Sequence, residues 1–209
     1  REVLAISHQP TESATGWEMV LEELTGRGLK QTKLIVADGL SGLEDAVAKV
    51  YPSADFQRCV THVKRRLLAR VRTEDKPTLR DDLRWVFATD RHEDDPEKGW
   101  KRWQELCAQW KGKYRRFARL EKDPFYRACF SYLKYERRMR NMIYTTNWIE
   151  RLNKDFRRVL KARNSMPDED SVITLMGHVA MNKRAYNRKV PKLNYEKKLF
   201  PQSPHENNS

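Results

Sequence analysis

Cysteine is scarce in this sequence of 209 residues, which contains only Cys59, Cys107 and Cys129. An odd number of widely spaced cysteines excludes a disulfide framework and fits a reducing compartment. No apolar run approaches the roughly 18 residues that suggest a membrane-spanning helix, and no signal peptide is recognisable. We therefore expect a cytoplasmic protein without a membrane partner.

Acidic residues are too few to balance the basic ones: 29 Asp and Glu stand against 42 Lys and Arg, a net charge of +13. The surplus is clustered, because residues 58–72 carry a net charge of +6 and residues 134–163 a net charge of +7. Residues 1–57, in contrast, carry a net charge of −4. Clustered basic charge favours a polyanionic partner, most often nucleic acid, with an inert basic surface as the alternative.

The first part of the chain alternates between two kinds of apolar pattern. Short apolar runs predict strands, and apolar residues three and four apart predict helices. The predicted order is strand 2–7, helix 13–24, strand 33–37, helix 42–50 and strand 54–57. Ser41 and Glu44 form a capping-box pattern for the helix at 42–50. This alternation indicates an α/β layer.

Residues 60–143 have an almost entirely helical pattern, with Asp95-Pro96 as a helix start. An apolar stripe follows at spacings of three and four: Trp100, Trp103, Cys107, Trp110, Tyr114 and Phe117. We interpret it as the packed face of a helix, and stacking on nucleic-acid bases is the alternative. Further helices are expected at 145–163 and 171–187, followed by a loosely ordered, proline-containing tail.

Two carboxylates stand at positions suited to chemistry. Asp38 follows the predicted strand 33–37, and ligands bind at the carboxyl ends of strands in open α/β sheets; the alternative is that Asp-Gly simply makes a turn. Glu150 lies on a predicted helix whose apolar face comprises Ile149, Leu152, Phe156 and Val159. A neighbouring face carries Asn147, Glu150, Lys154, Arg157 and Lys161. The alternative for Glu150 is a capping box with Asn147 as the N-cap.

Cys59 and His62 place a thiol and an imidazole three residues apart. A structural zinc site needs four ligands, and no second pair with suitable spacing exists, so zinc is not expected here. His62 is interpreted as a core residue or as a DNA-facing residue beside Lys64-Arg65-Arg66.

Three phrases occur together in a fixed order: Asp38-Gly-Leu-Ser-Gly-Leu-Glu-Asp-Ala46, then Gln57-Arg-Cys-Val-Thr-His62, then Thr145-Thr-Asn-Trp-Ile-Glu-Arg-Leu-Asn153. With Tyr51-Pro52 between the first two, this combination closely resembles the Mutator-type transposases of bacterial insertion sequences. The resemblance runs from Arg1 to about Asn187.

The resemblance implies an α/β fold, a ribonuclease-H-like core with a DDE triad and a large all-helical insertion, mostly α by residue count. Asp38 matches the second Asp, Glu150 matches the Glu, and Cys59 and His62 match a signature of open role. The implied parts are a partial core at 1–62, the insertion at 63–143, returning core helices at 144–187 and a basic flexible tail at 188–209.

The family carries the first Asp of the triad on a strand upstream of the segment that matches Arg1-Glu-Val-Leu4. This sequence departs from the family here, because it does not contain that strand or its Asp. We expect the chain to be a fragment with an incomplete sheet, in which the strands at 2–7 and 33–37 are not paired with each other. The parent enzyme would cleave transposon ends and transfer strands, whereas the fragment would be inactive.

The expected cofactor is Mg²⁺, with two ions held by Asp38, Glu150 and the missing carboxylate, and with Mn²⁺ as a substitute. Asp38 and Glu150 should then lie about 4–8 Å apart. The expected partner is DNA, bound by a homo-oligomer in a nucleoid-associated, bacterial setting. The residues expected to bind DNA are Arg58, His62, Lys64, Arg65, Arg66, Asn147, Arg151, Lys154, Arg157, Arg158 and Lys161. The alternatives are a non-catalytic nucleic-acid-binding module and an assembly partner that uses the Trp-rich segment as an interface.

Overall fold

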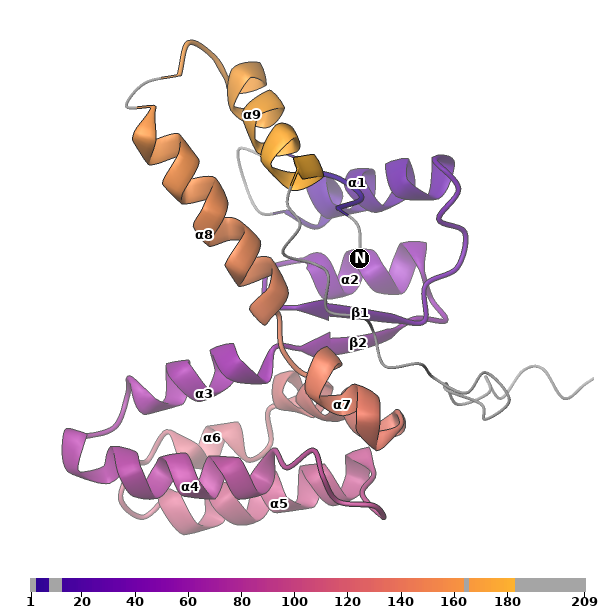
Figure 1. Ribbon diagram of the computed structural model, residues 1–209. Coiled ribbons are helices and arrows are strands. Elements are labelled where there is room, and N and C mark those ends of the chain that lie inside the picture. The colour runs from indigo at the N-terminus through magenta and orange to yellow at the C-terminus, as the bar shows by residue number, and fades with distance from the viewer. Residues whose placement is uncertain (1–2, 8–12, 164–165, 183–209) are drawn as a thin grey trace, which may run out of the picture. The chain divides into compact units, whose positions relative to one another are not determined.

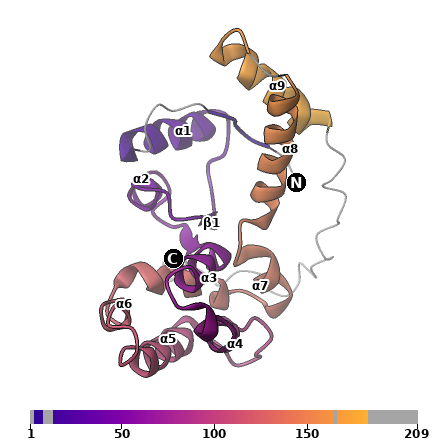
Figure 2. The same cartoon turned by 90° about the vertical axis from the view of Figure 1, so that its left-hand side faces the viewer.

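A computed structural model describes residues 3–7, 13–163 and 166–182 (Figures 1 and 2). The chain divides into two compact units. Of the described residues, the first unit comprises 3–7, 13–32, 40–52, 146–163 and 166–182, and the second comprises 33–39 and 53–145. The described residues are mostly helical, and their strands form a two-stranded sheet.

The first unit contains two helix pairs. Helix α1 (Ala14–Gly26) packs on α2 (Leu43–Val50), and α8 (Asn147–Ala162) lies beside α9 (Glu169–Asn182), as Figure 1 shows. Ser13 caps α1, because its hydroxyl accepts a hydrogen bond of 3.1 Å from the amide of Gly16.

Helix α2 begins differently from the predicted capping box. Its N-cap is Gly42, in the left-handed conformation with φ +73° and no side-chain capping bond, so the prediction for Ser41 is wrong. The physical reason is a close approach: a Cβ at Gly42 would lie 2.6 Å from the backbone nitrogen of Ala14. Glycine is therefore required both by the backbone conformation and by the contact with α1.

The second unit contains the sheet. Strands β1 (Leu34–Ala37) and β2 (Asp55–Arg58) run parallel, in a register from Leu34 opposite Asp55 to Ala37 opposite Arg58. Parallel strands need a crossover connection, and residues 38–54 with α2 provide it. The predicted strands at 33–37 and 54–57 are thus confirmed to within a residue.

Helical segments form the rest of the second unit (Figure 1): α3 (Val60–Leu68), η1 (Thr73–Asp75), α4 (Lys76–Val86), α5 (Pro96–Trp110), α6 (Phe117–Leu120), η2 (Pro124–Lys134) and α7 (Arg137–Ile143). Asp95 caps α5 as predicted, accepting a hydrogen bond of 2.8 Å from the amide of Lys98. The stripe on α5 and beyond is core: Trp103, Cys107 and Phe117 are fully buried, and Trp100 packs against the same cluster.

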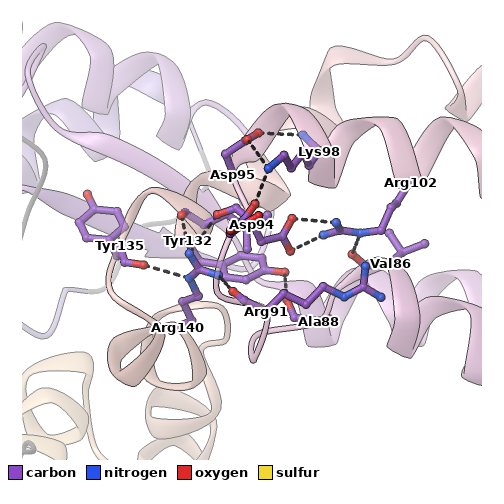
Figure 3. A network of polar contacts seen from close by, with 12 residues as sticks. Val86, Ala88, Arg91, Asp94, Asp95, Lys98, Arg102, Tyr132, Tyr135 and Arg140 are labelled. Carbon is purple, nitrogen blue, oxygen red and sulfur yellow. Dashed lines mark hydrogen bonds and ion pairs between the residues drawn. The ribbon is translucent and has the colours of Figure 1, made fainter.

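A network of buried charges joins α4, α5, η2 and α7 (Figure 3). The guanidinium of Arg140 donates to four backbone carbonyl oxygens at 2.9–3.0 Å, those of Arg91, Asp94, Leu133 and Tyr135. The guanidinium of Arg102 binds the carboxylate of Asp94 through both of its terminal nitrogens, at 2.6 and 2.7 Å. Because buried charges are tolerated only when their hydrogen-bonding groups are satisfied, this network fixes one arrangement of the four elements.

The predicted strand at 2–7 is not found, because the described residues 3–7 form no strand. A strand needs a neighbouring strand to pair with, and here Val3 and Leu4 are exposed and the carbonyl oxygen of Leu4 accepts from the guanidinium of Arg27 at 2.7 Å. Strand β1 pairs with β2 in a two-stranded sheet. Two strands do not establish a ribonuclease-H-like core, which therefore stays a prediction. The helix end predicted at 183–187 and the tail at 188–209 lie outside the described residues.

Candidate functional site

Asp38 is exposed directly after β1, at the carboxyl end of the sheet. Gly39 follows with φ +87°, a conformation that favours glycine. The next strand, β2, leads into α3, and the first turn of α3 carries His62. Its Nε2 atom lies 4.0 Å from Oδ2 of Asp38. The parallel strands therefore bring a carboxylate and an imidazole together at one edge of the sheet.

Cys59 holds the start of α3 in place. Its amide donates to the carbonyl oxygen of Ala37 at 2.6 Å, and its buried sulfur contacts the hydroxyl of Thr145 at 3.8 Å. The hydroxyl of Thr145 also accepts from that of Thr61 at 3.1 Å. These contacts give Cys59 a structural role, which the family signature left open.

The cysteine and the histidine of the signature thus have different neighbours. His62 faces Asp38, whereas Cys59 is 1% exposed against the segment that precedes α8. All three cysteines are free and buried. Among the described residues no group of three or more His, Cys, Asp or Glu could hold a metal ion.

Two arginines and a phenylalanine surround the Asp38-Gly39 turn. A Cβ placed on Gly39 would lie 3.7 Å from Phe125, 3.8 Å from Arg58 and 3.9 Å from Arg66. The guanidinium of Arg58 stacks on the ring of Phe125, 3.7 Å from its centroid. Sequence reasoning missed Phe125, because it lies 86 residues after Gly39 on η2 and carries no local signal.

The basic run on α3 is divided between surface and interior. Arg65 and Arg66 are exposed, whereas Lys64 is half-buried with its ammonium 5.5 Å from the ring centroid of Phe87. Burial, with a smaller contribution from the nearby charge of Arg84, lowers the pKa of Lys64 to about 8. Lys64 therefore contributes to packing as well as to the positive charge of this helix.

Glu150 lies in the first turn of α8, half-buried, in the first unit. The N-cap is Thr146 without a side-chain capping bond, so the capping box with Asn147 as N-cap is wrong. Leu152 and Phe156 are buried as predicted, but Ile149 is 54% exposed. The predicted DNA-binding cations of α8 are all exposed: Arg151, Lys154, Arg157, Arg158 and Lys161.

The second basic block contains structural charges that a sequence count cannot separate from surface charges. Arg140 is buried in the network of Figure 3. Lys134 forms an ion pair with Asp55, and Arg137 donates to the carbonyl oxygen of Asp90 at 3.2 Å. The exposed charge of this block is therefore concentrated on α8.

Asp38 and Glu150 offer carboxylate oxygens, the ligands that Mg²⁺ prefers. They belong to different units, so their predicted proximity stays a prediction. In chemical type the two residues fit a divalent cation, but two carboxylates do not make a complete ligand set for two ions.

None of the helices in the described residues combines the length and the apolar character that a membrane span requires.

Comparison with known proteins shows what this chain is related to. The family described as "Transposase, Mutator family" matches residues 1–189. The transposase for insertion sequence element IS1201 of Lactobacillus helveticus is 31% identical over 182 residues, which are 87% of this chain and 48% of that protein. The transposase for IS905 of Lactococcus lactis is 28% identical over 82% of this chain and 42% of its own length. The transposase for IS256 in transposon Tn4001 of Staphylococcus aureus is 28% identical over 87% of this chain and 46% of its own length.

The chain spans about half the length of the curated relatives it matches. The family match covers the segments that carry Asp38, the Cys59–His62 signature and Glu150. The chain therefore belongs to the Mutator family of transposases.

Proposed function

We propose that this chain is the larger part of a DDE transposase catalytic domain built on a ribonuclease-H-like core. Asp38 and Glu150 are two of its three carboxylates, and the parent enzyme cleaves transposon ends and joins them to target DNA. The observation that carries the proposal is the exposed carboxylate of Asp38 at the carboxyl end of β1, with His62, Arg58 and Arg66 beside it. Family membership over residues 1–189 supports the same assignment.

The residues around Asp38 suit phosphodiester chemistry. When bound, Mg²⁺ would activate the attacking oxygen and stabilise the leaving oxygen, and Asp38 and Glu150 would be its ligands. Arg58 and Arg66 supply fixed positive charge for a non-bridging phosphate oxygen. Stacking on Phe125 holds the guanidinium of Arg58 in one orientation, so that less ordering is needed when DNA binds.

The proposal requires Asp38 and Glu150 to lie close together, and cross-linking tests this directly. The three native cysteines are buried, so a D38C/E150C double variant offers two accessible thiols. A short bis-maleimide should join them within one chain, detected as a cross-linked peptide pair by mass spectrometry. A D38C/E169C variant is the matched control, because Glu169 is an exposed acid at the start of α9. Equal or absent cross-linking in both variants would overturn the active-site assignment.

A non-catalytic nucleic-acid-binding module remains the second candidate, and the exposed cations of α8 favour it. In that case Asp38 and Glu150 would be turn and helix residues only, and the cross-link would not form selectively. For the assembly-partner alternative, Trp103 and Trp110 of the Trp-rich insertion are buried in the core, whereas Trp85 of the same insertion is 46% exposed. Localisation at the bacterial nucleoid and homo-oligomerisation on DNA form part of the same proposal.

A further inference from the structure

Four arginines from two segments of the second unit converge on one pocket. Arg66 and Arg70 come from α3 and its C-terminal end, and Arg116 and Arg119 come from the α6 region. The pocket has a volume of about 270 Å³, and Leu67, Leu120 and Tyr126 complete its lining. We call this the arginine pocket.

The arginine pocket concentrates positive charge, although the carboxylate of Asp123 lies near enough to Tyr126 to raise the pKa of its hydroxyl, a smaller effect than burial. All four arginines are exposed, and within the described part of the chain no ion pair with a carboxylate involves any of them. A neighbouring hollow is lined by Arg115 as well as by Arg116 and Arg119. Like charges held around a cavity repel one another, and a bound anion would relieve that repulsion.

The size and the lining of the pocket select the class of anion. Small-molecule sites usually have volumes of about 300–1,000 Å³ and mostly apolar linings, so this pocket is small and unusually basic for a cofactor. Guanidinium groups bind phosphate oxygens through paired hydrogen bonds. Leu67, Leu120 and Tyr126 supply the apolar part of the lining, which suits the edge of a sugar. A phosphate group on a chain of sugars fits these features.

Arg66 connects the arginine pocket with Asp38. Arg66 lines the pocket, and its guanidinium lies 3.9 Å from the Cβ position of Gly39. His62, beside Asp38, and Arg66 lie four residues apart on α3, about 6 Å along the helix at a rise of 1.5 Å per residue. The pocket therefore adjoins the Asp38 turn and is within reach of the same DNA strand.

We propose that the arginine pocket binds a backbone phosphate of the DNA strand, close to the phosphate that lies at Asp38. The pocket thereby holds the strand and sets the position of the reacting phosphate. The placement at Asp38 rests on the function proposed for the chain, whereas phosphate binding by the pocket does not.

The test measures binding of a fluorescein-labelled 20-base-pair duplex by fluorescence anisotropy, in EDTA and over a range of salt concentrations. The variant is R116Q/R119Q, which keeps the length and polarity of both exposed side chains. The matched control is R80Q/K101Q, which removes the same charge from exposed positions on α4 and α5. Circular dichroism establishes that both variants are folded.

The pocket variant should bind more weakly, and its plot of log affinity against log salt should be shallower by about 0.9 for each phosphate that it no longer neutralises. The control should keep the slope of the unmodified chain. Equal slopes in the two variants would overturn the pocket assignment. The measurement is made in EDTA and needs no metal, so a failure of the proposed active site shows in cross-linking and leaves this measurement unchanged.

Discussion

At the scale of single residues, burial decides which of the many arginines are structural. Arg140 is 5% exposed and donates to four backbone carbonyl oxygens, whereas Arg138, two residues earlier, is exposed. Both belong to the same basic block of the sequence. The charge pattern predicts a nucleic-acid surface for the whole block, and only the packing separates the two roles.

Replacing Arg140 with Ala should destabilise the second unit strongly. The substitution leaves three buried carbonyl oxygens and one part-buried carbonyl oxygen without their donor, and each unsatisfied buried group costs about 1–3 kcal/mol. We expect a loss of at least about 3 kcal/mol in the free energy of unfolding, measured by urea denaturation. Arg138→Ala is the control and should change it by less than about 0.5 kcal/mol. Similar values for the two variants would show that the network is not a stabilising one.

Lys64 should make stability depend on pH in the alkaline range. Burial lowers the pKa of its ammonium to about 8 in the folded chain, against 10.5 as the ordinary value. Below pH 8 the folded and unfolded states both carry the charge, and the folded state bears the cost of burying it. Between pH 8 and 10.5 the unfolded state binds more protons, so the stability that this residue contributes rises with pH.

Lys64→Met removes that titration while keeping an unbranched side chain against Phe87. We expect the variant to be more stable to unfolding than the unmodified chain at pH 7. This difference in stability should shrink as the pH rises from 8 to 10.5. Thermal unfolding of both proteins at each pH measures the difference. A difference in Tm that is constant across this range would exclude the shifted pKa as its cause.

At the scale of elements, α5 and η2 show which structure local sequence signals predict and which structure depends on tertiary contacts. Its start at Asp95-Pro96 and its apolar stripe are both legible in the sequence, because capping and helical spacing are local rules. The 3-10 segment η2 is not legible in the same way, since its residues are fixed by distant partners. The side-chain amide of Gln57 donates to the carbonyl oxygen of Cys129 at 3.0 Å, and its oxygen accepts from the amide of Tyr132 at 2.7 Å.

Gly99 on α5 should be intolerant of alanine. Alanine favours a helix interior over glycine by about 1 kcal/mol, but a Cβ here would lie 2.5 Å from Phe130 and 2.7 Å from Leu133. Overpacking of this kind typically costs about 1–3 kcal/mol, so Gly99→Ala should lower the Tm. Gly112→Ala, where a Cβ meets nothing within 4 Å, is the control and should leave it nearly unchanged. A higher Tm for Gly99→Ala would show that Phe130 and Leu133 move aside at little cost.

At the scale of the whole molecule, the sequence motifs predict more than the local patterns do. Taken singly, Asp38 at a strand end is consistent with an ordinary turn residue and Glu150 with an ordinary helix residue. The order of the three sequence motifs is what marks them as candidate catalytic residues. The sequence could not predict Phe125 or the arginine pocket, because their parts lie about 50–90 residues apart and meet only through packing. It also overestimated the sheet, since an apolar run such as 2–7 forms a strand only where a neighbour pairs with it.

The isolated chain should not carry out strand transfer, with either Mg²⁺ or Mn²⁺. Asp38 and Glu150 supply two carboxylates, and the proposed chemistry uses three. A gel assay with a pre-cleaved, labelled transposon end and a plasmid target measures the joined product. Metal-dependent joining that Glu150→Ala abolishes would show that another residue of this chain completes the triad.

The contacts around Cys59 also have a consequence for the order of events during synthesis. The amide of Val60 donates to the carbonyl oxygen of Tyr144, and Thr61 bonds Thr145, so the start of α3 is completed by residues translated 84 positions later. At about 5–20 residues per second, Asp38 and the sheet wait roughly 4–17 s on the ribosome for these partners. Until η2 at residues 124–134 has been synthesised, β2 lacks its contacts with η2, and the nascent chain carries an open strand edge of the kind that chaperones protect.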